Sequence, residues 1–146
     1  MTQHPSREMR RFNYLLGETE AAYHEMALRL GLSDSALKLL YALYEQGGSM
    51  ALTALCRASG LSKQTVHSAL GRLAQEGAVL VEDAEGRTRR VRLTGQGAVL
   101  AENTVGRVIR LEDRVLAGWP GEDVATYLSL TERYLRDIRR LAEKEL

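Results

Sequence analysis

The residues with the clearest chemical character stand in one short stretch, residues 62–73, which reads SKQTVHSALGRL. Its apolar members Val66, Leu70 and Leu73 recur at the spacing of one helix face. The opposite face carries hydroxyl, amide, imidazole and cationic groups and no carboxylate: Lys63, Gln64, Thr65, His67, Ser68 and Arg72. Because carboxylates repel phosphate and short polar side chains can read base edges, such a face suits contact with a nucleic acid.

The elements around this stretch predict a helix-turn-helix. A short helix over about residues 52–58 precedes it, and the turn Ser59-Gly60-Leu61-Ser62 contains a glycine. Ser62 is a good N-cap for the second helix, whose apolar residues would dock it on the scaffold. We expect base contacts from Gln64, Thr65, His67 and Ser68, and phosphate contacts from Ser62, Lys63 and Arg72. The alternative is an ordinary surface helix, since any such helix can be polar on one side.

Residues 78–93, AVLVEDAEGRTRRVRL, predict a β-hairpin with arms at about 79–82 and 88–93. Period-two alternation puts Arg90 and Arg92 on one face and Val91 and Leu93 on the other. We expect Arg90 and Arg92 to contact phosphates, and Arg87, near the tip, to enter a minor groove. The alternative is that the arginines protect a sheet edge against unwanted strand pairing.

The whole chain predicts a mainly α fold with a small β-hairpin wing. Residues 33–93 would form a winged helix-turn-helix, between an N-terminal dimerisation helix (1–32) and C-terminal dimerisation helices (94–146). In the last segment, Thr94 would cap one long helix to about Gly118, and a final helix would follow from about Glu122. The flanking helices have apolar faces that need burial, which favours a two-fold homodimer. The alternative is that they fold back on their own domain.

Composition and charge agree with a cytoplasmic protein. The 146 residues are 45% hydrophobic and 27% charged, with a net charge of +1. Residues 57–92 carry seven Lys and Arg against four acids, whereas the rest of the chain carries 13 against 15. No apolar run approaches the roughly 20 residues needed to span a bilayer, and no hydrophobic leader follows the N-terminal charges. Positive charge is therefore concentrated around the predicted helix-turn-helix and hairpin.

The run from Gly60 to Gly97 resembles the signature of the MarR family of transcriptional regulators, in the branch with a Lys-Gln-Thr-Val recognition helix. The matching residues are Lys63, Thr65 and Val66, then Leu73 and Gly77, then Glu85-Gly86-Arg87, and finally Leu93-Thr94-Gly95-Gln96-Gly97. The resemblance implies a winged-helix homodimer on double-stranded DNA. We expect a repressor that binds a pseudo-palindromic operator, with half-site centres about 10 bp apart.

The same resemblance implies a small effector, often aromatic or anionic, bound between the dimer helices and the winged domain. Amphipathic rings are plausible lining residues for such a pocket, here Tyr23, His24, Tyr41 and Tyr44. These rings could equally belong to the core.

Other classes of function have fewer residues to support them. The three histidines have no ligand-like spacing, and there is no Gly-rich phosphate loop and no nucleophile motif, so we expect no enzyme, cofactor or metal. Glu20 and His24 could chelate a metal, but polar pairs four residues apart are common on solvated helices. Cys56 could make the protein a thiol-based redox regulator, although core packing explains it better. A winged-helix protein-interaction module with weak DNA binding is the remaining alternative.

Overall fold

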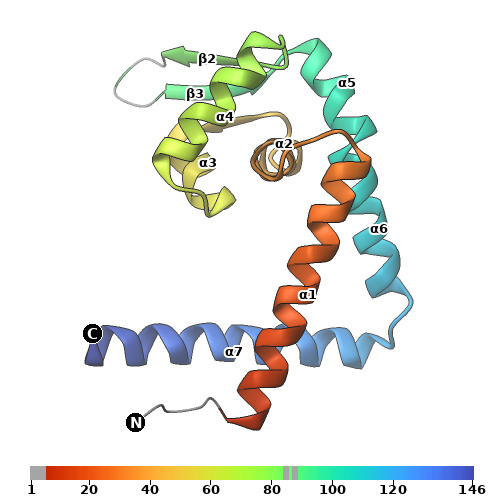
Figure 1. The fold of residues 1–146 in the computed structure, drawn as a ribbon, viewed down its shortest axis with the longest axis vertical. Helices are drawn as coiled ribbons and strands as arrows, with labels where there is room; N and C mark the ends of the chain where they lie inside the picture. Colours follow the sequence, from red (N-terminus) through yellow and green to blue (C-terminus); the bar gives the residue numbers. More distant parts are fainter. Residues whose placement is uncertain (1–5, 84–85, 87–88) are drawn as a thin grey trace. The chain divides into compact units, whose positions relative to one another are not determined.

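The computed structural model describes residues 6–83, 86 and 89–146 (Figure 1). It divides into two compact units, Met1–Val108 and Ile109–Leu146. The helices are α1 (Arg7–Arg29), α2 (Asp34–Glu45), α3 (Leu52–Ser59), α4 (Lys63–Gln75), α5 (Gly95–Asn103), α6 (Val105–Ala117) and α7 (Gly121–Glu145). The strands are β1 (Ser49–Ala51), β2 (Val79–Asp83) and β3 (Arg89–Leu93). The predicted mainly α fold with a small β wing is confirmed.

The first unit is built around α2, which contacts α1, α3, α4 and α5. Leu39, Leu40 and Leu43 of α2 are completely buried, and they lie in one cluster with Leu55 of α3 and Val66 of α4. Burial of a Leu or Val side chain contributes about 1.5–3 kcal/mol relative to leaving it exposed. This core fixes the helix-turn-helix as a rigid support for the polar face of α4.

Side-chain caps define where several helices begin, and the predicted caps Ser62 and Thr94 are confirmed. The hydroxyl oxygens of Ser33, Ser62 and Thr94 accept hydrogen bonds from the backbone N–H groups three residues later, at 2.9–3.1 Å. At the other end of α3, Gly60 adopts a left-handed conformation with φ 68°. Glycine adopts that conformation without the strain that a Cβ atom would bring, so the turn into α4 is sharp.

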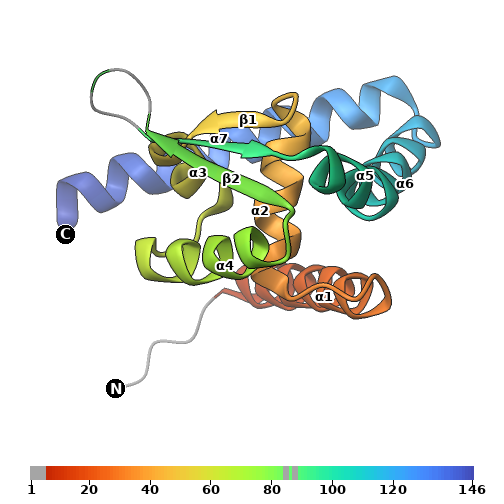
Figure 2. The same ribbon diagram turned by 90° about the horizontal axis from the view of Figure 1, so that it is seen from above.

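The expectation of a two-stranded hairpin is incomplete, because the sheet has a third strand. Its order is β1-β3-β2, and both pairs are antiparallel. Ser49 pairs with Arg92, and Ala51 pairs with Arg90. Figure 2 shows the strands side by side, with α4 running beneath them. A strand of three residues has too little alternation to be predicted from its own sequence.

The predicted helix from Thr94 to about Gly118 is wrong in one respect: it is two helices, broken at Thr104. Thr104 has φ −121° and ψ −86°, and its hydroxyl donates to the Leu100 carbonyl at 2.7 Å. Just beyond the break, a Cβ on Gly106 would lie 3.1 Å from the hydroxyl oxygen of Tyr44. The bend therefore lies where the chain passes close to α2, and this tertiary contact is invisible to helical periodicity.

The second unit contains the end of α6, a short turn and α7. Trp119 in the turn packs edge-on against Tyr127, with ring centroids 5.6 Å apart. α7 has no buried residue, although its apolar side chains recur along one side. Among residues 6–83, 86 and 89–146, no helix combines the length and apolar character that a bilayer span requires.

Candidate nucleic-acid interface

Helix α4 has two sharply different faces. Val66, Leu70 and Leu73 are at most 3% exposed, and Ala69 is buried beside them. The polar residues Lys63, Gln64, His67, Ser68 and Arg72 are exposed, and Thr65 is half-buried. The predicted apolar face is confirmed, and it leaves a continuous polar surface without a carboxylate through three turns of helix.

The N-terminus of α4 is fixed by two contacts between Ser62 and Thr65. The Ser62 hydroxyl oxygen accepts from the Thr65 backbone N–H at 3.1 Å and donates to the Thr65 hydroxyl oxygen at 2.8 Å. These contacts orient both hydroxyl groups within the protein. The first N–H groups of a helix have no intrahelical partner, so the backbone near Lys63 still offers donors to an anion.

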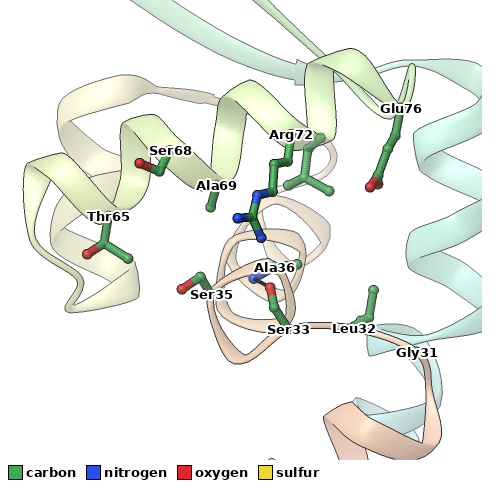
Figure 3. Close-up of a pocket in the computed structure, with 11 residues that line it drawn as sticks. Gly31, Leu32, Ser33, Ser35, Ala36, Thr65, Ser68, Ala69, Arg72 and Glu76 are labelled. Carbon is green, nitrogen blue, oxygen red and sulfur yellow. Dashed lines mark hydrogen bonds between the residues drawn. The ribbon is translucent and has the colours of Figure 1, made fainter.

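A groove of about 400 Å³ lies between α4 and the beginning of α2 (Figure 3). Thr65, Ser68 and Arg72 line it from α4, Glu76 lines it just beyond the end of that helix, and Ser33 and Ser35 line it from the other side. In Figure 3 the Arg72 side chain extends from α4 toward the first turn of α2. The sequence analysis assigned no DNA-binding role to Ser33 or Ser35, because their nearness to α4 depends on how the two helices pack.

The wing has the predicted division of faces. Val91 and Leu93 are buried, whereas Arg90 and Arg92 are exposed. Arg87 lies outside the residues that the structure describes.

Each arginine of β3 donates hydrogen bonds to a side chain on a neighbouring strand. The Arg92 guanidinium donates to a Glu82 oxygen at 2.7 Å, and the Arg89 guanidinium donates to an Asp83 oxygen at 3.0 Å. Arg90 donates through two nitrogens to the Ser49 hydroxyl oxygen, at 3.1 and 3.3 Å. Acids on β2 therefore offset part of the positive charge that the sequence assigns to this hairpin.

The four residues expected around an effector lie on two helices. Tyr23 and Tyr41 are half-buried and pack against the core. His24 Nδ1 lies 2.9 Å from both carboxylate oxygens of Asp34, and this contact joins α1 to the first turn of α2. Tyr44 donates to Glu102 at 2.5 Å and lines a cavity of about 490 Å³ to which the other three do not contribute. The role of these residues in effector binding stays a prediction.

Cys56 lies on α3, half-buried against the core, and is a free thiol. Within the described part of the chain, no group of three His, Cys, Asp or Glu side chains is placed to hold a metal ion. His24, one member of the possible chelating pair with Glu20, contacts Asp34 through its Nδ1 atom.

A helix-turn-helix followed by a small antiparallel wing defines the winged-helix class of proteins. Within that class, residues 30–90 match the sequence model of the MarR family. This stretch, which contains the helix-turn-helix, is similar to the MarR family in sequence.

Solved structures agree on the fold. A MarR family regulator from Neisseria meningitidis has a TM-score of 0.83 at 17% identity, over 96% of this chain and 99% of the other. The MarR family transcriptional regulator SPO1453 from Silicibacter pomeroyi DSS-3 has a TM-score of 0.72 at 23% identity, over 94% and 99%. MepR from S. aureus, in a DNA-binding conformation, has a TM-score of 0.75 at 16% identity, over 90% and 98%. No curated protein matches the chain in sequence.

Proposed function

We propose that this protein is a sequence-specific DNA-binding regulator that acts as a homodimer on a pseudo-palindromic operator. The observation that carries the proposal is the two-sided α4, whose apolar face is fully buried while its acid-free polar face is exposed. A helix supported in this way can enter a major groove without losing its packing. The DNA-binding conformation of MepR, which shares the fold, also supports it.

The side chains of α4 divide between base and phosphate contacts. Gln64 can pair with adenine through two hydrogen bonds, and His67 and Ser68 can reach neighbouring base edges. Lys63 and Arg72 are cations at the two ends of the exposed face, where they can contact phosphates. The groove beside Arg72 contains two serine hydroxyls near the beginning of α2, which can donate to a phosphate, and the carboxylate of Glu76, which repels one.

Apolar surface on the flanking helices supports the homodimer. On α1, Leu15 and Leu16 are 47% and 48% exposed. On α7, Tyr127, Ile138 and Leu141 are all more than 40% exposed, and they recur on one side of a helix of 25 residues. A long helix with one exposed apolar side is typical of helix–helix contact between two chains. We therefore propose that α1 and α7 dimerise, as expected from residues 1–32 and 94–146.

We also propose that the protein is a repressor relieved by a small molecule. PcaV from Streptomyces coelicolor, in complex with its natural ligand, shares the fold at 19% identity with a TM-score of 0.64. NadR, in complex with 4-hydroxyphenylacetate, shares it at 18% identity with a TM-score of 0.69. The cytoplasmic location stays a prediction.

The test is fluorescence anisotropy with the DNA immediately upstream of the protein's own gene, against scrambled DNA, at several salt concentrations. We expect tight, sequence-selective binding whose affinity falls steeply with salt, by about 0.9 log units per log unit of salt for each neutralised phosphate. Arg72→Ala should weaken binding and reduce this slope by about one. Arg107→Ala removes the same charge from an exposed position on α6 and is the matched control.

Two results would contradict the proposal. Equal affinity for the upstream and scrambled DNA would remove the claim of specificity for this operator. Weak binding that does not depend on salt, together with a stable protein partner in a pull-down, would favour the protein-interaction module.

A further inference from the structure

The end of α4 is tied to the start of α5 by hydrogen bonds across the base of the wing (Figure 1). Three consecutive carbonyl groups follow the last turn of α4, those of Glu76, Gly77 and Ala78. The first accepts from the Gln96 side-chain amide at 3.2 Å, and the second accepts from the Thr94 hydroxyl at 2.6 Å. The third accepts from the Thr94 backbone N–H at 3.0 Å. We call these three contacts the α4–α5 clamp.

The backbone at the clamp is packed too closely for the two helix ends to slide past each other. A Cβ on Gly97 would lie 1.8 Å from the carbonyl oxygen of Ala78, so α5 approaches this segment as closely as a glycine allows. A Cβ on Gly77 would lie 3.1 Å from Gln96 Oε1. The Gln96 amide therefore lies directly on the backbone that ends α4, and it donates to the carbonyl just before that glycine.

The rest of α5 is fixed to the core of the first unit. Ala101 is completely buried, and Glu102 accepts a hydrogen bond from Tyr44 of α2. After Thr104 the chain continues into α6, which extends past Val108 into the second unit. In the chain, α5 thus connects the end of the wing to the helices that include α7, for which we propose a role in dimerisation. The angle between α4 and α5 then helps to set the distance between the two α4 helices of a dimer.

Gln96 adds to this junction a contact that the core does not need. Its side chain is exposed, so it buries little apolar surface. Thr94 already caps α5 through its hydroxyl oxygen, which accepts the Gly97 N–H at 2.9 Å. What the glutamine supplies is a donor long enough to reach from the first turn of α5 to the carbonyl of Glu76. This contact restrains the direction of α4 rather than the formation of either helix.

We propose that Gln96 is a positioning residue for DNA binding, which fixes the angle of α4 and so restricts the half-site spacing that the dimer accepts. The proposal rests on the proposed function, because it requires two α4 helices on one operator. One additional base pair between the half-sites moves one of them by about 3.4 Å along the DNA and about 35° around it. An α4 helix that follows the half-site shifts against α5 and breaks the Gln96 contact.

The first test compares the operator with the same operator lengthened by one central base pair. Gln96→Met keeps an unbranched side chain but removes the donor, so the variant has no hydrogen bond to break on the longer DNA. The net contribution of one neutral hydrogen bond corresponds to a factor of roughly two to twelve in an equilibrium constant. We expect the wild-type ratio of the two dissociation constants, measured by fluorescence anisotropy, to fall by at least about twofold in the variant.

Gln46→Met is the matched control, because it makes the same substitution at an exposed position just after α2. It should keep the wild-type ratio. Urea unfolding of Gln96→Met should give a midpoint close to that of the wild type, since the side chain is exposed. If Gln96→Met binds both operators more weakly by the same factor, Gln96 contributes only to stability, and the proposal is overturned. An unchanged affinity for both operators would overturn it as well.

A second test needs no DNA and measures the distance between the two α4 helices directly. Cys56 is the only cysteine, so a spin label can be placed on Gln75→Cys, at the exposed end of α4, in a Cys56→Ser background. Double electron–electron resonance should give a broader distance distribution when Gln96→Met is added, and the wild-type width when Gln46→Met is added. Equal widths would overturn the positioning role.

The two tests separate this proposal from the proposed function. Selective binding of the operator with an unchanged spacing ratio in Gln96→Met would overturn the role of Gln96 and leave the proposed function intact. If the wild type binds neither operator, the proposed function fails, but the width of the distance distribution still decides whether Gln96 fixes α4. A wild-type protein with no distance between labels would be a monomer, which would overturn both.

Discussion

Gly71 and Gly97 both lie within helices of the first unit, and replacing them by alanine should change stability in opposite directions. Gly71 is in the middle of α4, and Gly97 is in the first turn of α5. Neither has a positive φ, so an alanine causes no backbone strain at either position. The two substitutions are chemically identical, and only the space around each Cβ differs.

At Gly71, no atom lies within 4 Å of the position that a Cβ would occupy. Alanine therefore brings no clash, and it restricts the unfolded chain more than glycine does. In a helix interior this difference is worth about 0.5–1 kcal/mol. We expect Gly71→Ala to raise the free energy of unfolding by that amount.

At Gly97, a Cβ would lie 1.8 Å from the carbonyl oxygen of Ala78 and 2.7 Å from its carbonyl carbon. These are backbone atoms, so no side-chain rotation can relieve the clash. The same oxygen accepts the Thr94 backbone N–H at 3.0 Å, and the Gly97 N–H donates to the Thr94 hydroxyl oxygen. Moving the two segments apart would therefore disturb the cap of α5 as well. Overpacking of this kind costs about 1–3 kcal/mol or more.

The assay is urea unfolding of both variants and the wild type at one protein concentration, because the stability of an oligomer depends on concentration. We expect a higher midpoint for Gly71→Ala and a lower one for Gly97→Ala, with little change in the slope. A Gly97→Ala protein as stable as the wild type would refute the packing of α5 against Ala78. A destabilised Gly71→Ala protein would refute the open space around Gly71.

Three further changes test the interface, the cap and the dimer. Glu82→Gln should strengthen DNA binding by a few-fold in anisotropy, because it removes the acid that holds Arg92; unchanged or weaker affinity would mean that Arg92 does not act on DNA. Ser62→Ala should lower the free energy of unfolding by about 1 kcal/mol, since it removes the acceptor for an N–H of α4; circular dichroism during denaturation measures this, and no loss would contradict the cap. Ile138→Glu should shift the protein to monomer in sedimentation, whereas Ser129→Glu, on the other side of α7, should not; a dimeric Ile138→Glu protein would exclude this face of α7 from the interface.

Local features of this fold could be predicted from the sequence because their causes lie within a few residues. Ser33, Ser62 and Thr94 act as caps through contacts that span three positions. The apolar side of α4 follows from helical periodicity alone. Both α4 and its cap therefore follow from local sequence alone.

Features that depend on distant residues could not be predicted in this way. The partner of β1 is β3, about 40 residues further along the chain. The break between α5 and α6 lies beside Gly106, which is close to Tyr44 in space but not in sequence. The nearness of Ser35 to Arg72 likewise follows from the packing of α2 against α4. Each of these features depends on contacts between residues far apart in the sequence, so local sequence patterns cannot predict it.

A count of charges along the sequence treats the cations of the helix-turn-helix and of the wing alike, but among the described ones only wing cations are paired with acids. Arg89 and Arg92 of β3 each donate to a carboxylate of β2, so DNA would have to compete with an existing ion pair at these positions. Lys63 and Arg72 of α4 have no acidic partner among the described residues. A DNA phosphate can therefore bind either side chain without breaking an ion pair within the protein. The salt dependence of DNA binding should therefore come more from α4 than from the described strands of the wing.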